Sequence, residues 1–219
     1  MYSTYKIVAG PLVWVAFILF FGGLLLQLLR FLYQVRTGEP FIASYMSWRY
    51  SFRSILHWII PFGTVRWRTR PVLTAVTFLF HFCLLVSPVF LLSHIVLTDE
   101  AWGITWWSLP DRLADVMCAI VIAGCLFFAF RRWIEPEVKF VTDSSDYFLL
   151  ALTAAPFVTG FLAYHQVTSG AWMTIVHMFS GEVLLAAIPF TRLRHMLFAW
   201  LMRAYIGSEF GKVRHARDW

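Results

Sequence analysis

Four long stretches of the sequence contain no Asp, Glu, Lys or Arg, and they constrain the fold more than any other feature. They are Ile7–Leu29, Pro71–Thr98, Val116–Phe130 and Tyr147–Gly181. A helix needs about 20 mainly apolar residues to cross a bilayer. Only 14% of the 219 residues are charged, against about 25% in ordinary soluble domains. A soluble protein could not bury so much apolar surface. The composition therefore excludes a soluble enzyme, a disordered chain and a secreted disulfide scaffold.

The pattern predicts an all-α integral membrane protein, a single domain over 1–219 built as a bundle of five membrane-spanning helices. We expect these helices at about 8–30, 71–97, 113–133, 147–165 and 171–196. The first is too long for the apolar region of a signal peptide, so we expect it to remain as a span. Residues 31–70 are expected to form a cytoplasmic interfacial segment. Within it, Tyr45–Arg70 mixes aromatic and basic side chains, which is typical of an amphipathic segment on a leaflet surface.

The net charge of +6 is explained by membrane topology, not by a nucleic-acid partner. Sixteen of the 18 Lys and Arg residues lie on alternate connections or the C-terminal segment, and the other side has only Lys6 and Arg112. Basic residues concentrate on the cytoplasmic side of membrane proteins. We therefore expect a periplasmic N-terminus, a cytoplasmic C-terminus and a place in the bacterial inner membrane.

Several cofactors are excluded by the cysteines and glycines. Cys83, Cys118 and Cys125 all lie inside predicted spans, and no C-x-x-C-H motif is present for a covalently attached c-type haem. The sequence has no cysteine cluster for an iron–sulfur centre. It also has no G-x-x-x-x-G-K-[ST] or G-x-G-x-x-G motif for a nucleotide.

Four histidines fall within the second and fifth predicted helices: His81, His94, His177 and His195. Ionisable side chains are costly in a bilayer and usually mark function. His177 and His195 are 18 residues apart, which is five helical turns, so both would face the same side about 27 Å apart. Because the two helices run in opposite directions, we expect His81 to meet His195 near the cytoplasm and His94 to meet His177 near the outside. Each pair could hold a haem iron, since neutral imidazole is a common axial ligand. The alternative is that these histidines are buried and form structural hydrogen bonds.

The position of His94 does not follow from an ideal helix. His81 and His94 are 13 residues apart, which points them about 220° apart around a regular helix. Pro88 lies between them and could kink or over-wind the helix enough to bring them round. His165, at the outer end of the fourth helix, is the reserve ligand.

Three runs of sequence carry a family resemblance: "FLFHFCLL", "FRRWIEPEVKFVTDSSDYFLL" and "IVHMFSGEVLLAAIPFTRLRH". They resemble the cytochrome b (gamma) subunits of respiratory nitrate reductases over the second to fifth helices. The resemblance implies five spans and two non-covalent b haems held by histidines of helices two and five. His81, His177 and His195 match three ligand positions. The fourth departs, because the family pattern would place a histidine where this chain has Leu91, so His94 has to substitute.

That departure makes the chain more similar to the small cytochrome b subunits of transmembrane redox complexes of sulfate-reducing bacteria. This resemblance implies electron transfer between a periplasmic multihaem cytochrome c, or the quinone pool, and cytoplasmic iron–sulfur subunits. A quinone such as menaquinone is a further candidate ligand. The chain would be an electron-transfer subunit of a membrane oxidoreductase complex, with a quinone oxidoreductase step as one option, and not catalytic alone.

Other polar groups inside or beside the spans are candidate site residues. A carboxylate at Glu182 is expensive in a bilayer, which favours a proton relay or a quinone site, with a structural hydrogen bond as the alternative. Arginines at the cytoplasmic ends of the third and fifth helices could pair with the propionates of the inner haem: Arg131, Arg132, Arg192 and Arg194.

Two other functional classes stay open, namely a non-redox membrane anchor or assembly subunit and a small transporter that uses Glu182 as its proton site.

Overall fold

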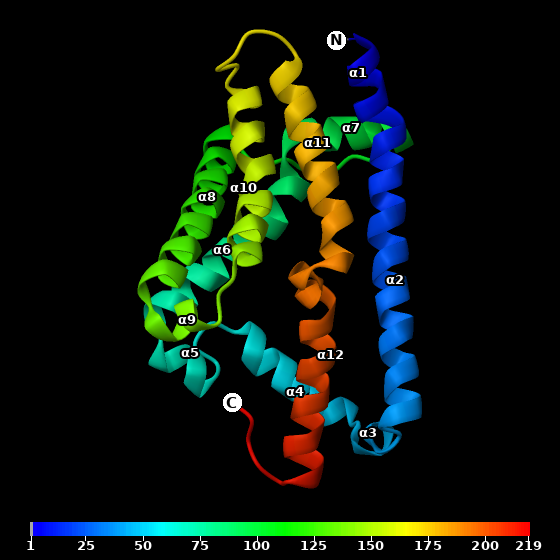
Figure 1. Ribbon diagram of the computed structural model, residues 1–219, viewed down its shortest axis with the longest axis vertical. Helices are drawn as coiled ribbons and strands as arrows, with labels where there is room; N and C mark the ends of the chain where they lie inside the picture. The colour runs from blue at the N-terminus through cyan, green and yellow to red at the C-terminus, as the bar shows by residue number, and fades with distance from the viewer. Residues whose placement is uncertain (1) are drawn as a thin grey trace. The chain divides into compact units, whose positions relative to one another are not determined.

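The computed structural model of the protein describes residues 2–219, which are helical throughout their regular structure and contain no β-strand (Figure 1). The predicted all-α class is confirmed. Within the described residues, five helical stretches are long and apolar enough to cross a membrane, which confirms the predicted number of candidate spans. They are Tyr2–Gly38, Pro71–Phe90, Asp111–Ile134, Ser144–Tyr164 and Trp172–Phe190.

The first helical stretch is much longer than the predicted helix at 8–30. It comprises α1 (Tyr2–Ile7), a π-helical turn (Val8–Leu12) that contains Pro11, and α2 (Val13–Gly38). Its 37 residues correspond to about 55 Å at 1.5 Å per residue. The hydrocarbon core of a bilayer is about 30 Å thick, so this helix extends well beyond the apolar layer.

The second predicted span, 71–97, is two helices. The first, α6, covers Pro71–Phe90, and α7 covers Leu92–Trp102. Leu91 between them has an extended backbone, with φ −72° and ψ 130°. Pro88 lies in the last turn of α6, where it weakens the helix because it cannot donate a backbone hydrogen bond. The consequence is a change of direction between His81 and His94.

The third and fourth predicted spans correspond to α8 (Asp111–Ile134) and α10 (Ser144–Tyr164), joined through the short α9 (Pro136–Phe140). The start of α10 is fixed by a capping box in which Asp143 and Asp146 each accept a backbone N–H of the other. This arrangement satisfies donors that every helix N-terminus leaves unpaired.

The fifth predicted helix, 171–196, is interrupted before it reaches His195. Helix α11 covers Trp172–Ala187 and is followed by two 3₁₀ turns, Ile188–Phe190 and Arg192–Arg194. Thr191 between the turns is extended, with φ −121°. Helix α12 (His195–Ser208) then begins at His195 itself, and a π-helical turn (Glu209–Val213) follows it. The regular five-turn geometry assumed between His177 and His195 therefore does not apply.

The described chain divides into two compact units, and each is described by itself. The first unit contains residues 2–9 and Val76–Leu184. Its core lies between α6, α8 and the segment before α8, and α10 packs against it. A Cβ on Gly124 of α8 would lie 2.6 Å from the ring of Phe80, so this glycine lets α6 and α8 approach closely. The buried core residues are Phe80, Cys83, Leu109, Ala114, Met117, Val121 and Cys125.

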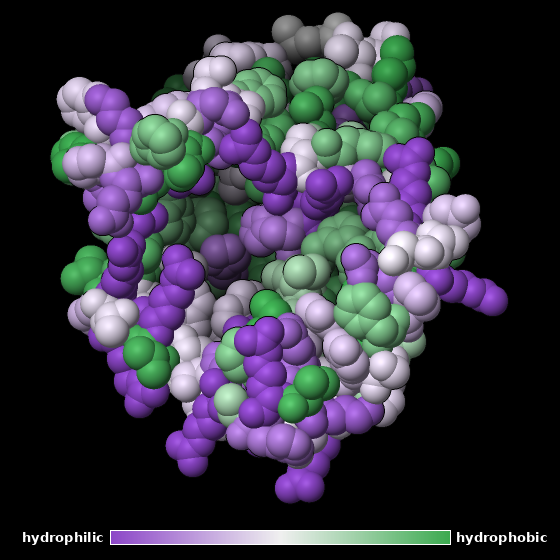
Figure 2. All heavy atoms as spheres, turned by 60° about the horizontal axis from the view of Figure 1, so that its bottom comes forward, coloured by the Kyte–Doolittle hydropathy of each residue, from purple (hydrophilic) through white to green (hydrophobic). Residues whose placement is uncertain are grey.

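The second unit contains Gly10–Ala75 and Leu185–Trp219. Its connection between α2 and α6 forms α3 (Phe41–Tyr45), α4 (Trp48–Ile59) and α5 (Val65–Thr69). Helix α4 crosses α12 in Figure 1. Hydrophilic side chains gather on the face shown in Figure 2, which looks onto the lower end of Figure 1 where α12 finishes.

Small residues make up the contact between α4 and α12. Ser51 Oγ donates to the carbonyl of Ala204 at 2.9 Å and lies 2.8 Å from Ser208 Oγ. Ser54 is fully buried. A Cβ on Gly207 would collide with the side chain of Ser54 and the carbonyl of Tyr50. The two helices therefore approach to near backbone contact and satisfy their own polar groups across the interface.

This interface predicts that Gly207→Ala destabilises the protein. The added methyl group has no space, and overpacking of this kind costs about 1–3 kcal/mol. The matched control is Gly22→Ala in α2, because a Cβ there meets nothing within 4 Å. Thermal unfolding in detergent should show a lower midpoint for Gly207→Ala than for Gly22→Ala. Equal midpoints would contradict the tight α4–α12 contact.

Candidate functional site

Two of the predicted histidines face each other within the first unit. His94 comes from α7 and His177 from α11, and both are half-buried. Their ring centroids are 6.0 Å apart and their planes are inclined by only 13°. The structure therefore brings together the pair expected near the outer side.

His94 reaches this position because α6 ends at Phe90. The last carbonyls of a helix have no partner within the helix and must be satisfied by other donors. The carbonyl of Pro88 accepts from His94 Nδ1 at 2.6 Å, that of Val89 from Trp106 Nε1 at 3.0 Å, and that of Phe90 from the backbone N–H of Leu109 at 2.8 Å. The end of α6 is thus fixed by three donors, and one of them is the imidazole of His94.

Trp106 is a residue whose role the sequence did not reveal. Tryptophan in a loop beside a span is usually an interfacial anchor, and nothing in its spacing marks it as a donor to a helix end. Its neighbour Trp107 stacks on Phe90 with ring centroids 4.3 Å apart. The loop before α8 therefore closes over the end of α6.

His177 is held from the α10 side. Its Nδ1 donates to the carbonyl of Pro156 at 2.9 Å. A Cβ on Gly160, one turn further along α10, would lie 2.8 Å from Cε1 and 2.9 Å from Nδ1 of the His177 ring. Only glycine leaves room for the ring at this position. The hydrogen bond to the carbonyl of Pro156 and the contact with Gly160 therefore set the orientation of the His177 ring.

The hydrogen bonds of His94 and His177 determine which nitrogen can bind a ligand. A carbonyl oxygen only accepts, so Nδ1 carries the proton in both rings and a neutral imidazole has its lone pair on Nε2. Histidines that bind metals commonly use this arrangement, with the second ring nitrogen bonded to a carbonyl. His165 differs, because its Nε2 lies 3.0 Å from Asp115 Oδ1. The reserve ligand is therefore engaged in a hydrogen bond between the C-terminal end of α10 and α8.

His81 and His195 lie in different units, so their predicted pairing stays a prediction. Each has its Nδ1 close to a backbone carbonyl of its own segment. His81 Nδ1 lies 2.7 Å from the carbonyl of Thr77, and His195 Nδ1 lies 2.9 Å from that of Arg192. Both rings thus share the Nδ1 arrangement of the outer pair.

Glu182 is buried in α11, with 6% of its surface exposed. Neither carboxylate oxygen has a hydrogen-bond partner among the described residues. The hydroxyls of Ser180 and Thr159, which lie 3.2 Å apart, bond to each other and to helix carbonyls. An ionised carboxylate buried without a partner is strongly unfavourable. Glu182 differs in this respect from Ser180 and Thr159, whose hydroxyl groups are hydrogen-bonded.

Two of the four candidate arginines already have carboxylate partners. Arg131 binds Glu135 at 2.8 Å, and Arg132 lies 3.8 Å from Asp146. Arg192 and Arg194 occupy the 3₁₀ turn before α12 in the second unit. The guanidinium of Arg194 lies 5.8 Å from the ring centroid of Phe198. The positive charge of Arg131 and Arg132 at the end of α8 is therefore partly neutralised by carboxylates of the same chain.

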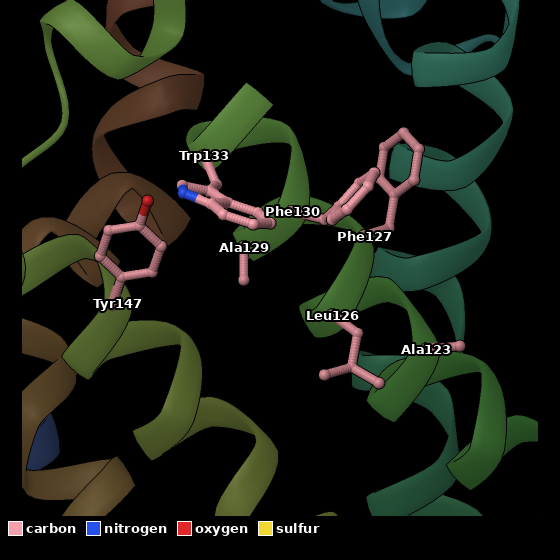
Figure 3. Close-up of a pocket in the computed structure, with 7 residues that line it drawn as sticks. All are labelled: Ala123, Leu126, Phe127, Ala129, Phe130, Trp133 and Tyr147. Carbon is pink, nitrogen blue, oxygen red and sulfur yellow. The ribbon is translucent and has the colours of Figure 1, made fainter. Parts of the chain in front are cut away.

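A groove on the surface of α8 contains none of these groups. It has a volume of about 800 Å³ and is open along its length (Figure 3). Figure 3 shows aromatic and aliphatic side chains of α8 on one side and Tyr147 of α10 on the other. Because this surface belongs to two candidate spans, its natural contact is with lipid chains. The lining residues are Ala123, Leu126, Phe127, Ala129, Phe130, Trp133 and Tyr147.

The donor groups present fit one kind of metal centre. Among residues 2–219, no group of three or more His, Cys, Asp or Glu side chains is close enough to hold a bare metal ion. Two imidazoles are enough for a haem iron, because the porphyrin itself supplies four nitrogen ligands and the protein has only to supply the remaining ones. The chemistry of His94 and His177 therefore fits a haem.

The chain is similar over most of its length to a bacterial protein. A protein of Nitratidesulfovibrio vulgaris strain Hildenborough is 34% identical over 216 residues, which cover 96% of this chain and 95% of the relative. The chain belongs to the family of that protein. The relative is described only as "Protein". Membership of this family therefore establishes common ancestry over nearly the whole chain, but it assigns no activity to the chain. No model of a known protein family matches the chain, and no solved structure matches it.

The contact between Gly160 and His177 predicts that Gly160→Ala destabilises the first unit. The new methyl group would push on the imidazole or separate α10 from α11, at a cost of about 1–3 kcal/mol. Gly181→Ala in α11 is the matched control, since a Cβ there meets nothing within 4 Å. The comparison is made by thermal unfolding of the purified protein in one detergent. A midpoint for Gly160→Ala equal to that of Gly181→Ala would show that the ring is not held against α10.

Proposed function

We propose that the protein is a dihaem b-type membrane cytochrome, of the kind found as the gamma subunit of respiratory nitrate reductases. The separation of His94 and His177 carries this proposal. Metal–imidazole bonds are about 2 Å long, and an imidazole ring has a radius of about 1 Å, so two rings that share one metal ion have centroids no more than about 6 Å apart. The separation in the structure is 6.0 Å.

Haem iron, when bound, accepts and releases single electrons, and the protein supplies binding, orientation and insulation. His94 and His177 would hold the haem iron through Nε2. The carbonyls of Pro88 and Pro156 hold their Nδ1 protons and so keep Nε2 available. Gly160 keeps the His177 ring in place. The apolar spans around the pair exclude water.

A second haem would be held by His81 and His195 on the cytoplasmic side. Arg131, Arg132, Arg192 and Arg194 are the candidates for its propionates, with the last two in the 3₁₀ turn that precedes His195. The basic connections support a cytoplasmic C-terminus and a periplasmic N-terminus. Two haems at different depths would pass electrons across the bacterial inner membrane.

The partners are those that the resemblance to the cytochrome b subunits of transmembrane redox complexes implies. Electrons would come from a periplasmic multihaem cytochrome c or from quinol, with menaquinol as the candidate. They would leave to cytoplasmic iron–sulfur subunits, or travel in the opposite direction. The chain would act as one subunit of a respiratory oxidoreductase complex.

Glu182 would couple electron transfer to protons. It is buried and both of its oxygens lack a partner among the described residues. A buried carboxyl of this kind is stable when it holds a proton and costly when it loses one. The Glu182 carboxyl would take up a proton when negative charge increases nearby and would release it when that charge is removed.

The test of the haem sites is an optical spectrum of the purified full chain, expressed with adequate haem supply. We expect b-type bands in the reduced-minus-oxidised spectrum and two haems per chain. His94→Ala should remove about half of the haem, because one of the two sites loses an axial ligand. His165→Ala is the matched control and should retain both haems, since His165 pairs with Asp115.

Two results would count against this assignment. Absence of b-type bands in the unmodified protein would favour a non-redox anchor or assembly subunit, or a proton-coupled transporter that uses Glu182. Retention of both haems by His94→Ala would show that another residue is the fourth ligand. Because His94 also bonds to the end of α6, its variant should be checked for intact helicity by circular dichroism.

The proton role of Glu182 predicts a pH-dependent haem potential. Coupling of one proton to one electron lowers the potential by up to about 59 mV per pH unit. Redox titrations at several pH values should show such a slope in the unmodified protein and a much smaller one in Glu182→Gln. Glu135→Gln, which removes an exposed carboxylate paired with Arg131, should leave the slope unchanged. An unaltered slope in Glu182→Gln would assign Glu182 a structural role.

A further inference from the structure

Helix α4 has three chemically distinct faces. Ser51 and Ser54 are buried on the face that packs against α12. A second face is apolar and exposed, with a spacing of three or four residues that places its members in one row along the helix. The exposed fractions in this apolar row are 93% for Trp48, 64% for Phe52, 41% for Leu56 and 43% for Ile59.

The third face of α4 is basic. Arg49, Arg53 and His57 follow one another at four-residue intervals, directly beside the apolar row. No Asp or Glu occurs in the sequence between Glu39 and Asp99. An exposed apolar row beside an uncompensated basic row is the pattern of a helix at a membrane surface.

The guanidinium of Arg53 is oriented by two aromatic rings. Its guanidinium carbon lies 4.8 Å from the ring centroid of Tyr50 and 4.4 Å from that of Trp219. Stacking of this kind fixes the plane of a guanidinium and leaves its N–H groups to bind a ligand. Arg53 has no acidic partner among the described residues, and its Nε is buried without a hydrogen bond.

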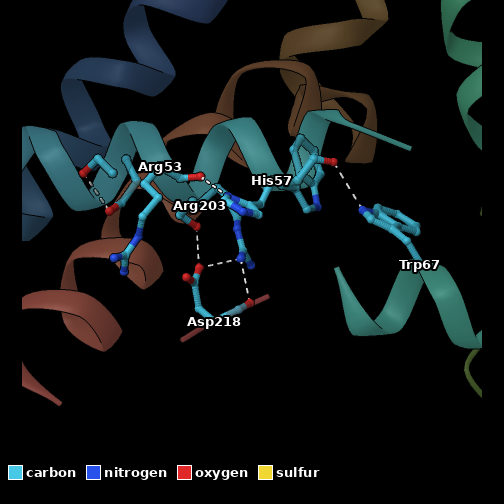
Figure 4. A network of polar contacts seen from close by, with 9 residues as sticks. Arg53, His57, Trp67, Arg203 and Asp218 are labelled. Carbon is cyan, nitrogen blue, oxygen red and sulfur yellow. Dashed lines mark hydrogen bonds and ion pairs between the residues drawn. The ribbon is translucent and has the colours of Figure 1, made fainter. Parts of the chain in front are cut away.

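The carboxylate of Asp218, next to Trp219 in the sequence, already has partners. Asp218 forms an ion pair with Arg203 and accepts a hydrogen bond from Ser54 Oγ. Figure 4 shows these bonds converging on Asp218, whereas no dashed line reaches the guanidinium of Arg53. The ring of Trp219 also stacks on His57, with centroids 4.2 Å apart and planes inclined by 25°. The last residues of the chain thus keep Arg53 and His57 in position without neutralising Arg53.

We propose that this face of α4 binds an anionic phospholipid of the inner leaflet. The guanidinium of Arg53 would donate to the headgroup phosphate, with Arg49 one turn away as a second donor. The apolar row beside them would lie against the acyl chains. Charge complementarity selects the occupant, because a basic face with no compensating acid attracts an anionic leaflet. This site belongs to the second unit and does not depend on haem.

The test compares lipids retained by the full-length protein after extraction from nanodiscs of equimolar phosphatidylglycerol and phosphatidylcholine. Native mass spectrometry counts each bound lipid. The unmodified protein should retain phosphatidylglycerol in preference. Arg53→Gln should retain about fivefold less, as expected for one arginine at a membrane surface. Arg66→Gln in α5 removes the same charge from an exposed side chain and should retain nearly the normal amount.

A second variant tests the positioning of Arg53. Trp219→Leu keeps the arginine and removes one of its two aromatic contacts, so phosphatidylglycerol retention should fall to an intermediate level. Equal retention of the two lipids, or equal losses in Arg53→Gln and Arg66→Gln, would overturn the proposal. So would normal lipid retention by Arg53→Gln together with loss of a co-purifying cytoplasmic protein, which would identify the face as a protein interface. Helicity by circular dichroism and the midpoint of thermal unfolding in detergent serve as the folding controls, and neither should change in these variants.

Discussion

The end of α6 at Phe90 leaves three carbonyl oxygens that the surrounding chain must satisfy. In an apolar medium an unpaired backbone group costs several kcal/mol, so a helix can stop there only if donors are supplied. His94, Trp106 and Leu109 supply them. These contacts redirect the chain at Leu91, close the outer loop over the helix and place one imidazole opposite another. The geometry of the candidate site is thus a consequence of backbone hydrogen bonding.

The same requirement explains the other interruptions of the helices. After Ala187 the chain passes through two short 3₁₀ turns, and the carbonyl of Pro189 in the first turn accepts a hydrogen bond from Gln27 of α2 at 3.1 Å. A Cβ on Gly23 of α2 would lie 2.6 Å from Pro189. Gln27 and Gly23 of α2 therefore accommodate the break in the chain after α11. Their presence in α2 had no evident reason in the sequence alone.

The number of candidate spans and the all-α class could be predicted because length and apolarity decide them. The break at Leu91 could not, since Pro88 signals a weak point without giving the direction of the chain beyond it. The angle of about 220° between His81 and His94 on a regular helix was the sign that the helix is not regular. The role of Gly160 was also hidden, because a glycine in a span is equally explained by helix packing. Only the ring of His177 against it distinguishes the two explanations.

The contact at Gly160 has a mechanical consequence. No flexible side chain separates the backbone of α10 from the His177 imidazole, and the carbonyl of Pro156 on the same helix binds that ring. The imidazole is therefore attached both to its own helix, through its side chain, and to α10, through a hydrogen bond and a direct contact. A sliding or tilting of α10, produced by a change in bilayer thickness or by a neighbouring subunit, would shift the ring. A force applied to α10 would thus change the position of the His177 nitrogens.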